Sequence, residues 1–255
     1  MLPGATANIR RIVGPHVRNS QCRAHAERVV GRFCDFVLDI GQSALQTPEE
    51  LRARIDRVDG HDAYVARRKL GGGAIVVTAH MGSFEVGLAA LAQVEKTIHV
   101  VFKRDAFDGF EIIRKRLRQR AGIHEAAIDD GWQAWAGLRD ALRDDEVVVL
   151  QADRAMAGQK SAVVPFLHGH LRLPLGPVKL ALASGAPIIP IFTVMTGRDR
   201  CRVFIEPPIE VTSADRAADA TSPALLSIAR AIEKFVKTYP DQWLVLTPAF
   251  VEDQK

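Results

Sequence analysis

From residue 73 onward, short runs of β-branched residues alternate with amphipathic, helix-length segments, and this alternation restricts the fold more than any other sequence feature. Strands separated by helices favour parallel pairing, with helices on both faces of the sheet. The sequence therefore predicts an α/β fold with a central, mainly parallel sheet flanked by helices. The expected strands are 73–79, 97–102, 146–152, 188–194, 202–205 and 243–246, and the expected helices are 84–91, 108–120, 132–142, 177–184 and 225–239.

The first seventy residues carry helical patterns instead. An apolar stripe with many arginines runs from Arg10 to Leu38, and it either packs on the core, which we favour, or lies on a membrane surface. Thr47-Pro48-Glu49-Glu50 has the pattern of a helix N-cap and capping box, with Leu51, Ile55 and Val58 then on one side. We expect a single domain over 1–255, in which N-terminal helices (1–70) precede an α/β core (71–247).

Composition limits where such a chain can reside. It is 47% hydrophobic and 25% charged, as in ordinary globular proteins, and its apolar stretch from Leu180 to Met195 is interrupted by glycine and proline. We therefore expect no spanning helix. The start of the chain lacks the pattern of a signal peptide, and three cysteines without a C-x-x-C pair suggest neither disulfides nor a zinc site, which fits the cytoplasm. The net charge of +4 favours an acidic partner.

A histidine and a carboxylate lie five residues apart where the first strand of the core ends. His80 follows the apolar run 74–79, and a short turn leads into the helix that contains Glu85. Functional residues of α/β folds gather at the carboxyl ends of strands. We expect Glu85 to hold one ring nitrogen of His80 and to leave the other free to take a proton. The alternative is a histidine satisfied by the backbone, with Glu85 in solvent.

Motifs around this pair occur in the order and spacing of a known family. The pattern H-x-x-x-x-E at 80–85 is followed by Val101-Phe-Lys103-Arg104, Gln151-Ala-Asp153-Arg154, Pro165-Phe166-Leu-His-Gly169 and Tyr239-Pro-Asp-Gln-Trp243. From about residue 8 to residue 247 the chain resembles the lysophospholipid acyltransferase superfamily, and specifically its lipid A biosynthesis (lauroyl/myristoyl) acyltransferase branch.

That resemblance implies transfer of a fatty acyl chain from an acyl carrier protein or CoA thioester to a hydroxyl or amine of a lipid or glycolipid acceptor, with no cofactor. His80 would be the general base, and Glu85 would stabilise the imidazolium. The oxyanion of the tetrahedral intermediate would be stabilised by backbone N–H groups around Gly82 and Ser83 or by a cationic side chain. Residues at other strand ends would complete the substrate site: Lys103, Arg104, Asp153 and Arg154. No metal site is predicted.

Two features depart from the family. Bacterial members of the lipid A branch usually begin with a hydrophobic anchoring helix, which this sequence does not show, and the F-P-E-G-type block of the glycerolipid branches is missing. We therefore expect peripheral attachment to the anionic inner face of the cell membrane through basic residues such as Arg10, Arg11 and Arg18. The second departure argues against a glycerol-phosphate acceptor.

Two other functions fit the same residues. A thioester hydrolase would use His80 and Glu85 to activate water, and a non-catalytic basic module would bind acidic lipid or nucleic acid. Aromatic residues make up only 6% of the chain, which gives little support for base stacking, so nucleic acid is not an expected partner.

A cluster of cations lies on the helix expected at 108–120, and its members are Arg114, Lys115, Arg116, Arg118 and Arg120. Because Phe110, Ile113 and Leu117 should face the core, most of these cations should point outward. They would then form a solvated face, or they would dock an acidic carrier protein or a phosphate group.

Overall fold

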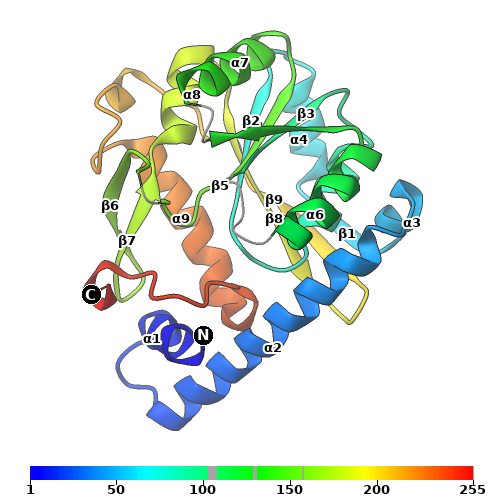
Figure 1. Ribbon diagram of the computed structural model, residues 1–255. Helices are drawn as coiled ribbons and strands as arrows, with labels where there is room; N and C mark the ends of the chain where they lie inside the picture. Colours follow the sequence, from blue (N-terminus) through cyan, green and yellow to red (C-terminus); the bar gives the residue numbers. More distant parts are fainter. Residues whose placement is uncertain (103–107, 129–130, 157, 255) are drawn as a thin grey trace.

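A seven-stranded sheet forms the centre of the computed structural model, which describes residues 1–102, 108–128, 131–156 and 158–254 (Figure 1). The strand order is β1-β9-β8-β2-β5-β3-β4. Neighbouring strands are parallel except β8 and β9, so the predicted mainly parallel sheet is confirmed. The bounds are Ile55–Asp59 (β1), Ala74–Thr78 (β2), Ile98–Phe102 (β3), Ile123–Ala127 (β4), Val147–Gln151 (β5), Ile188–Met195 (β8) and Cys201–Ile205 (β9).

Helices cover both faces of this sheet, as its sequence requires. Residues of β2 are buried along the whole strand, and alternate side chains point to opposite faces. Val76 packs with α4 and α5, whereas Ile75 and Val77 pack with α8 and α9. The helix bounds are Leu2–Val13 (α1), Asn19–Ser43 (α2), Pro48–Ala53 (α3), His61–Arg68 (α4), Phe84–Leu91 (α5), Asp108–Arg120 (α6), Trp132–Arg143 (α7), Gly176–Ser184 (α8) and Pro223–Thr238 (α9).

The N-terminal region differs from its prediction in two places. The stripe from Arg10 to Leu38 is divided between α1 and α2, because Gly14 adopts a positive φ of 92° and Pro15 follows it. Thr47 caps α3 as expected, but the helix ends at Ala53. The next residues form β1, which pairs with β9 at the sheet edge, so Ile55 and Val58 do not lie on a helix. Tertiary pairing there outweighs the local helical pattern.

An antiparallel hairpin was not expected from the sequence. It consists of β6 (Ser161–Phe166) and β7 (Gly169–Pro174), joined by the two-residue turn Leu167-His168. Two-residue hairpin turns usually contain Asn or Gly because they need positive φ, and here Leu167 takes a φ of 50° without that signal. Val164 of β6 and Leu171 of β7 are buried in the main core and anchor the hairpin there.

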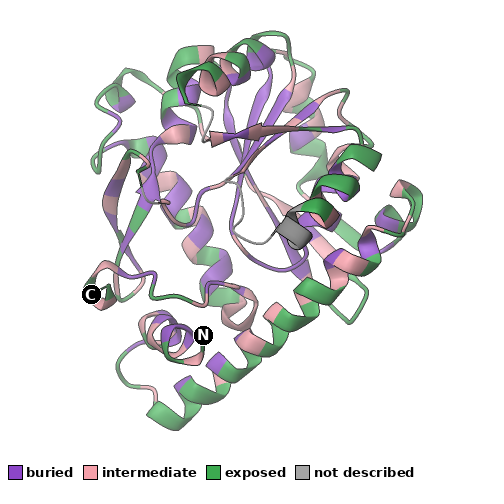
Figure 2. Cartoon of the chain, viewed as in Figure 1, coloured by how far each residue is buried: buried purple, intermediate pink, exposed green. Residues whose placement is uncertain are grey.

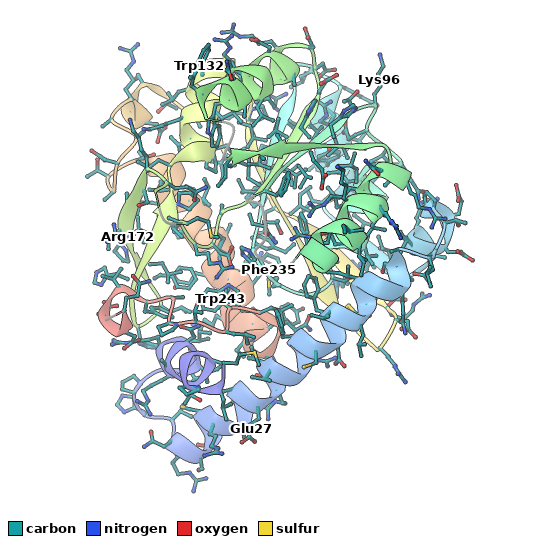
Figure 3. All side chains as sticks on the ribbon, viewed as in Figure 1. Glu27, Lys96, Trp132, Arg172, Phe235 and Trp243 are labelled. Atoms are coloured by element: carbon teal, nitrogen blue, oxygen red, sulfur yellow. The ribbon has the colours of Figure 1, made fainter. Side chains whose placement is uncertain are left out.

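The C-terminal segment that follows α9 does not form the short strand expected at 243–246. A 3₁₀ turn, η3 (Pro240–Gln242), leads to a single antiparallel bridge between Trp243 and Met81. Figure 3 shows Trp243, which belongs to this segment, in the interior of the molecule, whereas Trp132 lies on the outer side of α7. The segment thus crosses the molecule next to the turn that follows β2.

The long helix α2 lies along one side of the molecule, and much of its length is exposed (Figure 2). One side of α2 packs against the core through the buried side chains of Cys22, Ala26 and Val29. Leu38 on its other side is 67% exposed. No helix in the described ranges combines the length and apolar character needed to span a bilayer.

Candidate active site

His80 and Asp153 meet because two neighbouring strands are in register. β2 and β5 are parallel with Thr78 opposite Gln151, so both residues follow two positions beyond the last aligned pair. His80 Nδ1 lies 2.7 Å from Asp153 Oδ1, and the backbone N–H of His80 donates to Oδ2 at 3.1 Å. One carboxylate therefore holds both the ring and the backbone of the histidine.

Asp153 is fully buried and ionised. Its Oδ2 also accepts a hydrogen bond from the indole N–H of Trp243 at 2.8 Å. Burial alone would raise the pKa of Asp153, but the charge and hydrogen bond of His80, the charge of Arg154 and the indole hydrogen bond outweigh it and hold this pKa at about 2. Because an ionised carboxylate only accepts hydrogen bonds, His80 Nδ1 carries the proton of the shared bond.

The other ring nitrogen of His80 is open to a substrate. The side chain is 27% exposed, and among the described residues none forms a hydrogen bond with Nε2. In a neutral ring whose Nδ1 is protonated, Nε2 holds a lone pair. The pair can therefore take a proton at Nε2, and Asp153 would stabilise the imidazolium that results.

Glu85, the partner expected for His80, faces the other way. Both residues are described, and the structure contains no hydrogen bond between them. Glu85 is 3% exposed and accepts from Arg118 at 2.7 Å (Nη2 to Oε1) and from Arg114 at 3.2 Å. The first turn of α5 points its side chain toward α6, where Arg118 needs a buried counter-charge. Glu85 thus fixes α5 against α6.

The cation cluster of α6 is divided between the interior and the surface. Arg118 is only 1% exposed, and it also donates to Glu125 at 3.1 Å. Most of the cluster is exposed as expected, and Arg118 is the exception, because two carboxylates balance its buried guanidinium charge. Lys115 and Arg116 are exposed as expected.

Gly82 and Ser83 shape the turn after His80, and the N–H of Gly82 and the hydroxyl of Ser83 already have partners. The N–H of Gly82 donates to the Gln242 carbonyl at 3.2 Å, and a Cβ at this position would collide with the Thr193 carbonyl at 2.0 Å. The Ser83 hydroxyl donates to Asp39 on α2 at 2.6 Å. In this geometry the Gly82 N–H is not available to an oxyanion.

Arg154 is the predicted cation that the structure places next to the pair. Its Nε is buried and has no hydrogen-bond partner among the described residues. Lys103 and Arg104 lie outside the described residues. Across the described ranges, no three His, Cys, Asp or Glu side chains converge in a way that could hold a metal ion.

Trp243 was not singled out by sequence reasoning, although it ends the motif Tyr239-Pro-Asp-Gln-Trp243. The motif indicated the family but not the contact, because Trp243 and Asp153 are ninety positions apart in the sequence. A buried tryptophan needs a hydrogen-bond acceptor for its N–H, and that requirement was the available signal.

Two hollows flank the turn after β2. The larger, about 570 Å³, lies between the sheet and α5, and its mostly apolar wall includes Thr78, Phe84 and Leu88. The smaller, about 370 Å³, lies on the α2 side of the turn, where Gly82 and Ser83 meet charged residues such as Arg32 and Arg198. Charged residues such as Arg52 and Asp56 also line the larger hollow, and His80 and Asp153 are in the wall of neither.

Comparison with known proteins places this chain in a family. Residues 4–251 match the family described as bacterial lipid A biosynthesis acyltransferase. The chain is 26% identical over 206 residues to a phosphatidylinositol mannoside acyltransferase of Mycobacterium tuberculosis (strain ATCC 25618 / H37Rv), covering 80% of this chain and 63% of that protein. It is 24% identical over 184 residues to a protein of the same name from Mycolicibacterium smegmatis, covering 72% of this chain and 58% of that protein. The chain thus spans about three fifths of these relatives. Because the family match extends over nearly its whole length, the chain belongs to the bacterial lipid A biosynthesis acyltransferase family.

Proposed function

We propose that this protein transfers a fatty acyl chain from a thioester, of acyl carrier protein or of CoA, to a hydroxyl of a lipid or glycolipid acceptor. The observation that carries the proposal is the His80–Asp153 pair, with its buried anion and open Nε2, in a chain of an acyltransferase family. The relatives named as phosphatidylinositol mannoside acyltransferases support an acceptor that is a lipid with a sugar head group.

The proposed reaction needs one base that becomes an acid. His80 Nε2 takes the proton of the acceptor hydroxyl as its oxygen attacks the thioester carbonyl carbon. The tetrahedral intermediate then expels the thiolate, which receives the proton from the imidazolium, so that an ester and a free thiol result. Asp153 keeps its negative charge throughout and stabilises the imidazolium between the two steps.

Arg154 is the residue that we propose for the developing negative charge. It follows Asp153 at the edge of the sheet, and its buried Nε lacks a partner within the described residues. An N–H donor placed beforehand near the reacting carbonyl stabilises an oxyanion without reorganisation. The same guanidinium could instead hold a phosphate of the donor or the acceptor, for which its planar fork is suited.

We assign the two hollows to the two substrates. The larger hollow under α5 would take the acyl chain, because its wall includes apolar β2 and α5 residues that flank the His80 turn. The charged hollow beside α2 would take the polar part of the acceptor. The two substrates would then approach the turn from opposite sides.

Attachment to a membrane would use α2 and not only the predicted arginines. Arg11 is engaged with Asp253, whereas Val37, Leu38 and Leu45 expose apolar surface on α2 and just beyond it. Exposed apolar side chains beside basic residues bind the interface of anionic bilayers, and the electrostatic part weakens with salt. We propose a peripheral position on the cytoplasmic face, which vesicle flotation at low and high salt would test.

The function is tested by following free thiol. Acyl carrier protein and CoA thioesters of several chain lengths are incubated with the protein, with and without a lipid extract. Thiol release that requires the extract supports the transferase. Release at the same rate without extract would indicate a hydrolase, and no release with any donor would contradict both enzymatic functions.

His80→Ala should lower the rate of transfer by ~10²–10⁴-fold, because a general base contributes about that factor. The fold should persist, since the side chain is partly exposed. The rate is measured with saturating donor and compared with the matched variant His170→Ala, whose histidine pairs with Glu252 on the β7 side of the molecule. Equal rates in the wild type and the His80 variant would exclude the proposed base.

A further inference from the structure

The C-terminal segment is attached to the catalytic turn by its backbone. The N–H of Leu244 donates to the His80 carbonyl at 2.7 Å, and the Gln242 carbonyl accepts from Gly82. Trp243 lies between these two contacts, in its bridge with Met81. The indole is therefore placed by the same turn that places His80.

The indole N–H is one of two donors that hold Oδ2 of Asp153. The last torsion of an aspartate is broad, so hydrogen bonds set its orientation more than torsional preference does. Oδ2 receives two donors, the indole N–H of Trp243 and the backbone N–H of His80, which leaves Oδ1 directed at the ring. Because Trp243 is 1% and Asp153 0% exposed, water is not at hand to replace either group.

The segment is also tied to α2 at its start. Asp241 accepts from Arg28 at 2.6 Å and pairs with the His25 ring, both on α2. Gln242 uses both ends of its amide on the Met195 backbone, at 2.8 and 2.9 Å. These contacts hold the segment against α2 and against Met195 of β8, so that the indole N–H of Trp243 has a defined position from which to donate.

We propose that Trp243 is a positioning residue for the reaction: its indole N–H holds Oδ2 of Asp153 so that Oδ1 stays on His80 Nδ1. The proposal rests on the proposed function for its kinetic consequences. Its structural part does not depend on turnover, since the orientation of the pair affects how tightly His80 and Asp153 together bind a proton.

Trp243→Phe removes the N–H and keeps an aromatic ring in the core. We expect kcat to fall by roughly 10–100-fold, the equivalent of one hydrogen bond to a charged group, with the acceptor KM nearly unchanged. The charged and titratable groups that face Asp153 are His80 and Arg154. With one donor lost, negative charge concentrates on Asp153 and the pair binds its proton more tightly, so the acid limb of kcat/KM moves to higher pH.

The matched control disturbs the same packing without touching the hydrogen bond. Phe250 contacts the Trp243 ring edge-on, with centroids 6.3 Å apart, and Phe250→Leu should lower thermal stability while leaving the pH profile in place. Should Trp243→Phe not fold, replacing Trp243 by benzothienylalanine keeps the shape and removes only the N–H. The Trp243 variants are expected to shift the profile, and the Phe250 variant is not.

A second readout needs no substrate. Labelled histidine is followed by NMR through a pH titration, with the His80 signal assigned by its loss in His80→Ala. A higher titration midpoint in Trp243→Phe, absent in Phe250→Leu, supports the proposal. An unchanged midpoint and unchanged kcat would overturn it, as would equal effects of both variants. If the wild type transfers no acyl group while the midpoint shifts, the proposed function fails and the positioning role stands.

Discussion

Two buried carboxylates lie near the turn that follows β2, and their partners differ in kind. Asp153 accepts hydrogen bonds from a histidine ring and from two other N–H groups, whereas Glu85 accepts hydrogen bonds from the guanidinium groups of Arg118 and Arg114. Arginine stays protonated in proteins, so the charge of Glu85 is permanently matched. Histidine gains and loses a proton near neutral pH, so the charge of Asp153 can serve a proton transfer.

The comparison shows that burial alone does not mark a catalytic carboxylate. Both side chains are at most 3% exposed, and both lie within reach of the same turn. What separates them is whether the opposite charge is fixed or can appear during a reaction. We therefore expect substitutions of Asp153 to act on rate and substitutions of Glu85 to act on stability.

Asp153→Asn should have the largest effect, a fall in kcat of ~10²–10⁴-fold. The amide keeps the size of the side chain, but it no longer stabilises an imidazolium and it can present an N–H to His80 Nδ1, which favours the wrong tautomer. Steady-state kinetics measures the change, with thermal unfolding as the check on folding. A kcat within a few-fold of wild type would remove Asp153 from the mechanism.

Glu85→Gln should instead destabilise the fold by about 3 kcal/mol, because it leaves the buried Arg118 charge without its main partner. For a chain of this size, that corresponds to a fall in Tm of roughly 6–12 °C. The kcat of the folded fraction should change by a few-fold at most. Glu125→Gln is the matched control: Glu125 also contacts Arg118 but is 16% exposed, so its loss should cost less. A large loss of kcat with an unchanged Tm would restore Glu85 to the role first expected for it.

The sequence was sufficient for what depends on local pattern. His80 could be identified because a buried β-branched run ends there, and α5 begins at Phe84 as its apolar spacing predicts. The partner of His80 could not be identified in that way. It depends on β5 lying beside β2 with Thr78 opposite Gln151, and periodicity does not give strand order or register.

The same distinction explains the elements that were missed. β1 exists because β9 offers a free edge, a fact about residues nearly 150 positions away. The segment around Trp243 looked like a strand by composition, but its backbone pairs with the turn 80–82 through a single bridge, which the hydrogen bonds from Leu244 to His80 and from Gly82 to Gln242 form. Each contact is set by tertiary structure, and those of the Trp243 segment lie at the site.

Acid should reveal the contribution of the Asp153 carboxylate to stability. The pKa of Asp153 is about 2 in the fold, below the ordinary value of 3.8, so its contribution is full above about pH 4 and is lost as the pH falls toward 2. The contribution is about 2 kcal/mol. Chemical unfolding at several pH values measures it: the stability difference between wild type and Asp153→Asn should shrink over that range. A difference that stays constant from pH 5 to pH 2 would mean that Asp153 has no depressed pKa.

The smallest expected effect concerns the exposed cations of α6, in contrast to the buried Arg118. Lys115 and Arg116 are exposed, so reversing both to Glu should change stability by no more than about 0.5 kcal/mol. Arg118→Glu, in contrast, should prevent folding, because it places a third carboxylate beside Glu85 and Glu125.

If the exposed pair of Lys115 and Arg116 docks an acidic carrier protein, the double reversal should raise KM for the carrier-protein thioester. It should also weaken the dependence of this KM on salt, because electrostatic steering is lost. KM for the CoA thioester is the internal control, since it separates docking of a protein from binding of a phosphate. If KM is unchanged for both donors, Lys115 and Arg116 are a solvated face, and the function of α6 lies in the buried pair of Arg118 and Glu85.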